Sequence, residues 1–308
     1  MKYLFPKKCI GVVLILTLFC LSCKEKPKNT EEKQNPELAK TEEKMKYGGL
    51  ALYTLRDDMA ADAKKTLKEV ANIGYKNIEA AGYENGKYYG MDPSDFKAYL
   101  DSLDLTPIST HLSSVTLENI DTLIADAKQV GFRYFVVPVP PMGMFKFNPE
   151  TVELSMEGTA EELTSILMEM GKKCNAAGLQ LLYHNHDFEL VDDEEGSRIL
   201  DYLLENCDAE MVNFQMDLYW AKRAGADALK YFEKYPGRFK SWHVKDMDEQ
   251  GRFAAVGTGS IDFHSILSKK EQSGMEYYFV EQDMTFDGLQ PFEAVKISHK
   301  ALKEIGFD

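Results

Sequence analysis

A rhythm of short apolar runs and longer amphipathic segments constrains the fold of this chain more than any other feature. It repeats eight times from Tyr47 onward. Runs of this kind are typical of buried parallel strands, and the segments between them have the length and spacing of helices. The expected strands are 50–55, 77–81, 107–112, 134–139, 179–186, 212–217, 241–245 and 277–282. Eight strand–helix units in about 260 residues predict a single (β/α)8 TIM barrel over residues 47–308.

A doubly wound open sheet is the alternative α/β fold. Such a sheet usually has fewer strand–helix units and a glycine-rich first turn. No GxGxxG pattern follows any of the expected strands. This absence favours the barrel and argues against a dinucleotide site.

The N-terminal 46 residues have a different character. Met1–Lys8 carries three lysines and no acid, and the apolar run Cys9–Leu21 has 13 residues. This run is shorter than the roughly 20 residues that span a bilayer, so it is typical of a signal-peptide core. The run ends in Ser22-Cys23, which resembles a bacterial lipobox. We therefore expect a lipoprotein signal peptide over residues 1–22 and a lipid on Cys23, with ordinary signal-peptidase cleavage as the alternative.

Residues 23–46 contain mostly lysine, glutamate and proline. Such a segment cannot bury enough apolar surface to fold, and it is expected to be a disordered tether. The predicted location is therefore the cell envelope, as a membrane-anchored lipoprotein facing the periplasm. Contact with the membrane is expected only through the lipid on Cys23.

Charge excludes one class of partner. Residues 1–46 hold 10 lysines and 6 glutamates, so residues 47–308 carry 26 basic and 44 acidic groups, a net charge of −18. Nucleic-acid binding depends on basic groups that neutralise phosphates, so no nucleic-acid partner is expected. Cys174 and Cys207 have no zinc-site spacing and are expected to be buried thiols.

Polar side chains gather where the expected strands end. They are Glu79, His111, His184, His186, Glu189, Asp217, His243, Lys245 and Glu281. In a barrel these positions share one rim, the rim on which TIM-barrel enzymes place their active sites. A single histidine at a strand end is more often a hydrogen-bonding residue than a ligand. Three of the residues, however, come from consecutive strands spaced about 4.8 Å apart, which lets Asp217, His243 and Glu281 reach one ion.

The donor set also limits which ion is expected. Carboxylates with one imidazole and no thiol suit a divalent metal ion such as Mn, Mg, Co or Zn. They do not suit copper(I) or an iron–sulfur cluster.

The order of short motifs along the chain resembles that of a known family. The motifs are LYTLRD (52–57), NIEAAG (77–82), YHNHDFEL (183–190), MDLYW (216–220), WHVKDM (242–247), GTGSIDF (257–263) and VEQD (280–283). As a set they resemble the xylose isomerase-like TIM barrels, which are often labelled sugar phosphate isomerase/epimerase. The resemblance covers Tyr47–Asp308.

In the ketose epimerases of this superfamily, Glu, Asp, His and Glu from strands five to eight hold the metal. Position by position, Asp217, His243 and Glu281 match the last three. For the first ligand the resemblance implies Glu189, with His184 or His186 as replacements.

The resemblance also implies roles for the remaining rim residues. Glu281 with His184 or His186 would move protons, and Lys245 would stabilise charge, its alternative role being an ordinary salt bridge. Glu79 and His111 would hold substrate hydroxyls. Trp220 stands where the epimerases carry a histidine, and it would either stack on a sugar face or pack the rim.

The implied chemistry is proton abstraction next to a carbonyl through a metal-bound enediolate. The product decides the reaction: epimerisation, aldose–ketose isomerisation, or β-elimination by a lyase or dehydratase acting on a 3-keto-glycoside. A periplasmic lipoprotein meets few sugar phosphates, so a non-phosphorylated keto-sugar or glycoside is the expected substrate.

Two other classes of protein stay open. One is a sugar-binding lipoprotein without turnover, since a fold alone proves no activity. The other is a metal-dependent endonuclease, against which the acidic charge argues. A homodimer is compatible with the resemblance, although no sequence feature requires it.

Overall fold

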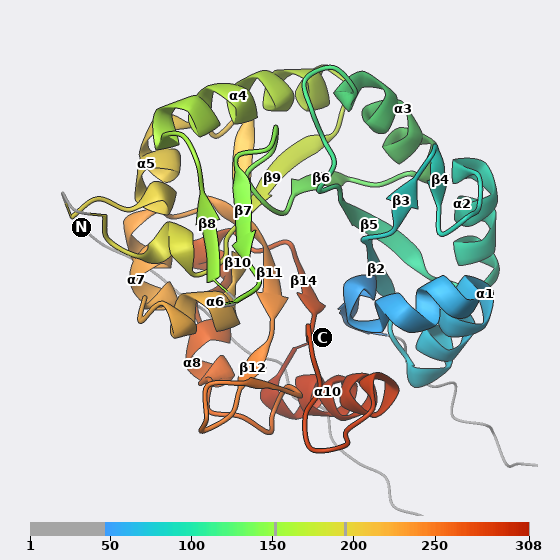
Figure 1. The fold of residues 1–308 in the computed structure, drawn as a ribbon. Helices are drawn as coiled ribbons and strands as arrows, with labels where there is room; N and C mark the ends of the chain where they lie inside the picture. Colours follow the sequence, from blue (N-terminus) through green and yellow to red (C-terminus); the bar gives the residue numbers. More distant parts are fainter. Residues whose placement is uncertain (1–46, 151–152, 194–195, 308) are drawn as a thin grey trace, which may run out of the picture. The chain divides into compact units, whose positions relative to one another are not determined.

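Eight parallel strands close into a barrel in the order β1-β14-β11-β10-β9-β6-β5-β2 (Figure 1). The computed structural model describes residues 47–150, 153–193 and 196–307. The barrel strands are β1 (Gly49–Ala51), β2 (Asn77–Ala80), β5 (Thr106–His111), β6 (Tyr134–Val137), β9 (Gln180–His184), β10 (Val212–Asp217), β11 (Phe239–Val244) and β14 (Tyr277–Val280). The predicted TIM barrel is confirmed. The signal peptide, the lipid on Cys23 and the tether lie outside the described residues.

Helices surround the barrel (Figure 1). They are α1 (Arg56–Ile73), α2 (Pro93–Ser102), α3 (Ile120–Val130), α4 (Ala160–Ala176), α5 (Ile199–Asn206), α6 (Leu218–Arg223), α7 (Ala228–Lys234), α8 (Phe263–Leu267), α9 (Lys270–Ser273) and α10 (Pro291–Ile305). Gly74 and Gly131 end α1 and α3 in the left-handed conformation that glycine adopts without strain. Thr159 begins α4 with a capping box to Glu162. Within the described chain, no helix is long and apolar enough to cross a membrane.

Two features differ from the strand pattern expected from sequence. The first strand stops at Ala51, and Leu52–Leu55 form a 3-10 turn, η1, instead of its second half. A short apolar run does not distinguish a strand from a buried helical turn. The second difference is three hairpins in segments that follow barrel strands: β3–β4 (Tyr83–Glu84 with Lys87–Tyr88), β7–β8 (Phe145–Asn148 with Glu153–Met156) and β12–β13 (Asp246–Met247 with Phe253–Ala254).

The barrel interior has an apolar layer and a polar layer. The apolar layer is Ala51, Ile108, Tyr134, Val136, Leu182 and Phe279. Side chains on a strand alternate between its two faces, so residues two positions apart face the same side. His184 follows Leu182 by two positions, and Glu281 follows Phe279 in the same way, so these polar side chains lie above the apolar layer at the carboxyl ends of the strands. Below the site the barrel is therefore closed by packed side chains.

A candidate metal site at the carboxyl end of the barrel

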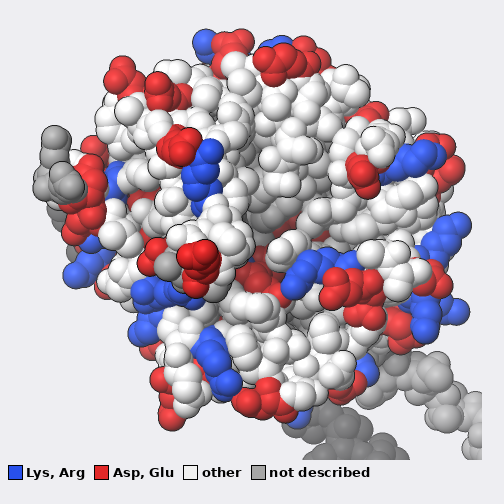
Figure 2. Space-filling model, in the orientation of Figure 1, with Lys and Arg blue, Asp and Glu red and all other residues white. Residues whose placement is uncertain are grey.

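Three predicted ligands meet at this end of the barrel. Asp217 ends β10, His243 lies on β11 and Glu281 directly follows β14. One ligand atom from each lies within 4.8 Å of the other two, and all three side chains are buried. His243 Nδ1 is 2.8 Å from Glu281 Oε2 and 3.7 Å from Asp217 Oδ2. Figure 2 shows a hollow near the middle of this face of the molecule, with acidic side chains at its bottom.

His184, at the end of β9, supplies a fourth donor beside this group. Its Nε2 lies 3.8 Å from Asp217 Oδ2, and the side chain is buried. Burial is the main cause that lowers the pKa of His184 well below its usual value, so the ring is a neutral lone-pair donor. His184 therefore occupies the strand-five position, for which the sequence also offered His186 and Glu189.

Glu189 is not brought into this group, which corrects its assignment as the fourth ligand. Its Oε1 accepts a 2.7 Å hydrogen bond from the Tyr183 hydroxyl, and its Oε2 accepts one of 2.8 Å from the His186 backbone N–H. Tyr183 and His184 are neighbours on a strand and so point to opposite faces. By bonding to Tyr183, Glu189 lies on the face away from His184. Burial raises the pKa of Glu189 to about 8.

A layer of hydrogen-bonded polar groups lies next to the imidazoles. Glu79 Oε1 is 2.5 Å from His243 Nε2, and its Oε2 accepts hydrogen bonds from the Ser109 hydroxyl (2.5 Å) and from Gln215 Nε2 (2.8 Å). Burial alone would raise the pKa of Glu79, but His111 and His243 lower it. Glu79 is therefore an ionised support for His243. Its oxygens are occupied, which leaves its predicted role in binding substrate hydroxyls without support.

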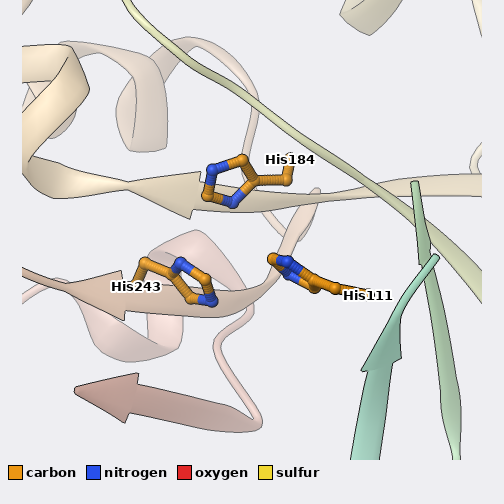
Figure 3. A group of neighbouring side chains, drawn as sticks. All are labelled: His111, His184 and His243. Carbon is orange, nitrogen blue, oxygen red and sulfur yellow. The ribbon is translucent and has the colours of Figure 1, made fainter. Parts of the chain in front are cut away.

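Three imidazoles, from β5, β9 and β11, face one another in this layer (Figure 3). The rings of His111 and His243 stack with centroids 5.0 Å apart. Both His111 Nε2 and His184 Nδ1 contact Gln215 Oε1, at 2.7 and 3.0 Å. These three histidines form a second geometric cluster of potential ligand atoms. The nitrogens that face Gln215 are hydrogen-bond donors, however, and a donating N–H cannot coordinate a cation.

Unpaired buried atoms favour the carboxylate-containing group for the metal. Among the described residues, His243 Nδ1 and Asp217 Oδ2 are buried without an aligned hydrogen-bond partner. Their near neighbours, Glu281 Oε2 at 2.8 Å from His243 Nδ1 and Lys245 Nζ at 3.0 Å from Asp217 Oδ2, make ion pairs with them and not aligned hydrogen bonds. Buried polar atoms normally have an aligned hydrogen bond, so both atoms have room for a further ligand in their bonding. The set of His184, Asp217, His243 and Glu281 has two imidazoles and two carboxylates, which suits Zn, Mn or Co and also admits Mg.

Lys245 is buried beside the same carboxylates. Its Nζ lies 2.6 Å from Glu281 Oε2, 3.0 Å from Asp217 Oδ2 and 3.0 Å from Asp283 Oδ1. Burial alone would lower the pKa of Lys245, but Asp217, Asp283 and Glu281 raise it well above its usual value. The ammonium group is therefore a permanent charge in the site.

An aromatic wall stands next to Lys245. The Trp220 ring lies 5.3 Å from the ring of His186 and 5.6 Å from that of Phe253, and Lys245 Nζ is 5.8 Å from its centroid. Trp220 is only 8% exposed, so it is mainly a packed part of the wall, the second of its two expected roles. Burial, followed by the charge of Lys245, lowers the pKa of His186 to about 3, and its Nδ1 is also buried and unpaired within the described structure.

Sequence reasoning missed Gln215, Ser109, Ser241 and Asp283. Each of these residues is two positions from a residue that the sequence analysis identified, namely Asp217, His111, His243 and Glu281, respectively. The two-residue period of a strand was the signal that would have found them.

Comparison with known proteins agrees with this architecture. The family model described as xylose isomerase-like TIM barrel matches residues 67–305. The chain therefore belongs to the xylose isomerase-like TIM barrel family. Among curated relatives, the inosose dehydratase of Lacticaseibacillus casei is 25% identical over 265 residues, 75% of this chain and 85% of the relative. That of Geobacillus kaustophilus is 24% identical over 238 residues, 67% of this chain and 74% of the relative.

Solved structures show the same fold. A sugar phosphate isomerase/epimerase from Parabacteroides distasonis is 26% identical, with a TM-score of 0.70, and the match covers 84% of this chain and 98% of that one. The IolI protein, solved with a bound zinc atom, is 15% identical, with a TM-score of 0.62 over 84% of this chain and 97% of its own; this likeness is one of fold. These relatives confirm, in its coarser form, the prediction of a sugar-modifying TIM-barrel enzyme.

Proposed function

We propose that this protein is a divalent-metal-dependent isomerase or epimerase that removes a proton next to the carbonyl of a non-phosphorylated keto-sugar or glycoside. His184, Asp217, His243 and Glu281 would hold the ion. The observation that carries the proposal is the convergence of these buried donor atoms, with ligand atoms of Asp217, His243 and Glu281 within 4.8 Å of one another and His184 Nε2 3.8 Å from Asp217 Oδ2. Such a site fits a catalytic ion better than a structural one, because it lies at the open rim of the barrel.

A bound divalent ion would polarise the sugar carbonyl and make the adjacent C–H more acidic. Glu281 is suited to accept that proton. Burial alone would raise its pKa, but His243 and Lys245 lower it well below the usual value, so the group is a carboxylate. Lys245, held 2.6 Å from Glu281, would stabilise the negative charge that develops on the sugar oxygens. The neutral His186 in the aromatic wall is placed to hydrogen-bond a sugar hydroxyl.

β-Elimination by a lyase or dehydratase is the second candidate. The observation that favours it is the name of the curated relatives, inosose dehydratase, at 24–25% identity. Elimination begins with the same proton removal by Glu281 and differs in the group that then leaves. The two candidates are therefore separated by their products.

The loop that follows β11 supports a substrate without phosphate. TIM barrels frequently bind phosphate with the backbone of the loops after strands seven and eight, and β11 is the seventh barrel strand. Here the backbone N–H groups of Gly257, Gly259 and Ile261 donate to the buried Asp246 carboxylate at 2.9–3.1 Å. Asp246 thus occupies the donors and would repel an incoming anion.

Exposed apolar side chains support a substrate with a second ring or an aglycone. In the described structure, the exposed large apolar residues are Tyr53, Met142, Phe147, Val191, Met284 and Ile297. All except Ile297, which lies on α10, are in segments that follow barrel strands, at the end of the barrel that carries the site. Aromatic and other apolar side chains near a polar pocket commonly bind the faces of sugar rings or apolar groups.

Solvent exchange tests the proposed reaction. The protein would be stripped of metal, reloaded with Mn²⁺ and incubated in D2O with keto-sugars and 3-keto-glycosides, while NMR follows the sugars. We expect metal-dependent deuterium incorporation at a carbon beside the carbonyl, and the product (epimer, isomer or enone) names the reaction. Metal binding without exchange on any substrate would favour a sugar-binding protein. Equal turnover of a phosphorylated and a plain keto-sugar would refute the substrate assignment.

We also propose that the chain is a lipoprotein of the cell envelope. Support comes from the charged N-terminus, the 13-residue apolar run and Ser22-Cys23. Metabolic labelling with a clickable fatty acid should label the protein, and Cys23→Ser should abolish the label. Equal labelling of the variant would contradict the assignment.

A further inference from the structure

The Gln215 side chain contacts four other polar side chains. Its side chain is completely buried in β10, two positions before Asp217. One end of the amide contacts Glu79 Oε2 at 2.8 Å and Ser241 Oγ at 3.1 Å. The other end contacts His111 Nε2 and His184 Nδ1, at 2.7 and 3.0 Å. A single side chain thus connects four strands across the barrel.

The chemistry of the partners fixes which end of the amide is which. An ionised carboxylate accepts hydrogen bonds and donates none. The end that faces Glu79 must therefore be the NH2 group, and the end that faces the histidines must be the carbonyl oxygen. That oxygen only accepts, so His184 must carry a proton on Nδ1 to bond with it. A neutral imidazole has one N–H, which leaves His184 Nε2 as the lone-pair nitrogen.

This nitrogen faces the proposed metal ligands. His184 Nε2 lies 3.8 Å from Asp217 Oδ2, on the opposite side of the ring from Gln215. We propose that Gln215 is a positioning residue, which holds His184 as the Nδ1–H tautomer and so presents Nε2 to the metal. The inference rests on the proposed metal site, but the tautomer is a property of the metal-free protein and can be measured without the ion.

Gln215 also limits where a second ion could bind. His111 Nε2 and His184 Nδ1 both donate to Gln215 Oε1, so neither nitrogen can coordinate an ion while Gln215 is in place.

The test is ¹⁵N NMR of the histidine side chains in metal-free protein. Long-range ¹H–¹⁵N correlations distinguish a protonated from an unprotonated ring nitrogen, and His184→Gln assigns the signal. We expect His184 to be the Nδ1–H tautomer in the wild-type protein. An Nε2–H tautomer there would overturn the proposal, whatever the variants do.

Matched variants separate the tautomer effect from a general packing effect. Gln215→Glu keeps an acceptor oxygen toward His184 and should keep the Nδ1–H tautomer. Gln215→Met has a similar volume without an acceptor, and it should release His184 to the other tautomer. Ser241→Ala removes a partner of the opposite end of the amide and should leave the tautomer unchanged. If Gln215→Met retained the Nδ1–H tautomer, Gln215 would not be the residue that sets it.

Metal affinity is the second readout. Groups that orient a metal ligand typically contribute 10- to 100-fold in metal affinity. Titration with Co²⁺, followed by absorbance, should show a loss of about that size in Gln215→Met and a smaller loss in Ser241→Ala. Wild-type protein with the expected tautomer but no affinity for Co²⁺, Mn²⁺ or Zn²⁺ would refute the proposed metal site while supporting the role of Gln215 in the tautomer.

Discussion

Lys245 is the residue whose contacts most directly affect the proposed metal site. Its ammonium group lies within 3.0 Å of Asp217 Oδ2 and Glu281 Oε2, two oxygens that the ion would share. The cation neutralises these buried carboxylates in the metal-free state, and it remains next to them when an ion binds. In the proposed site, Lys245 would therefore weaken metal binding and would supply positive charge for the reaction.

Lys245→Met should change these two properties in opposite directions. Removal of the repulsion should tighten Mn²⁺ binding by about tenfold or more, which corresponds to about 1.4 kcal/mol or more. Loss of the charge that stabilises the enediolate should slow proton exchange by about 10² to 10³. Titration calorimetry and the D2O exchange assay measure the two effects. A variant with weaker metal binding and unchanged exchange would contradict both roles.

Glu189 has a structural role that pH can reveal. Burial raises its pKa to about 8 from an ordinary value of 4.5. Between these values the folded protein keeps the proton that the unfolded chain releases. The contribution of Glu189 to the free energy of unfolding therefore falls as pH rises from about 4.5 to about 8.

Glu189→Gln should remove this pH dependence. The amide can accept from the His186 N–H and donate to the Tyr183 hydroxyl, so the two hydrogen bonds are kept. Urea denaturation at pH 5 and pH 8 should show that wild-type protein loses roughly a few kcal/mol more stability than the variant does. Metal affinity should stay within about twofold, since Glu189 is placed away from the proposed site. A large loss of metal affinity would restore Glu189 as a ligand.

At the scale of elements, the two-residue period of the strands explains most of the site. It places Asp217, His243 and Glu281 on the inner face, and all three could be identified from sequence. The eight strands and most helix ends were also predictable, because glycines such as Gly74 and Gly131 mark where helices stop.

The choice between His184 and Glu189 required the structure. His184 and Glu189 follow the same apolar run in the sequence. In the structure β9 ends at His184, so His184 is the last residue whose direction the strand fixes, and it points into the barrel. The 3-10 turn η2 (Phe188–Leu190) then carries Glu189 to the other face. The hydrogen-bond partners of Gln215 could also not be predicted from the sequence, because they come from four different strands.

The loop after β11 depends on Asp246. This carboxylate accepts hydrogen bonds from the backbone of Met247, Gly257, Gly259 and Ile261. A Cβ on Gly259 would lie 2.3 Å from Asp246 Oδ1, so the close approach requires glycine. The buried Asp246 carboxylate therefore holds the backbone of this loop in its conformation.

Asp246→Ala should destabilise the protein by roughly 2–4 kcal/mol, because several backbone donors lose their acceptor. The matched control is Asp262→Ala. Asp262 caps the short helix α8 from an exposed position, and its loss should cost about 1 kcal/mol. Chemical denaturation compares the two variants. Equal destabilisation would show that Asp246 does not hold the loop.

At the scale of the whole molecule, the barrel places all of its strand ends on one rim. Residues 47–308 carry a net charge of −18, which disfavours an anionic substrate, and most of the exposed large apolar side chains of the described structure lie in segments that follow barrel strands. The proposed substrate is therefore a neutral sugar whose second ring or aglycone would contact the rim.

Phe147→Ser and Met284→Ser should test that contact. Each should raise KM about three- to tenfold for a glycoside with a bulky aglycone and leave KM for the free keto-sugar unchanged. Ile297→Ser is the matched control, since Ile297 is exposed on α10, away from the rim segments. Steady-state kinetics on both substrates would show the difference. An equal effect of all three substitutions would exclude a rim contact.

The proposed site holds one divalent ion between four residues at the barrel rim. Crystals soaked in Mn²⁺ or Zn²⁺, with anomalous diffraction measured at the metal absorption edge, would show where the ion binds. We expect one strong peak within bonding distance of His184 Nε2, Asp217, His243 Nδ1 and Glu281. A peak among His111, His184 and His243, a peak at Glu189, or no peak at a saturating metal concentration would contradict it.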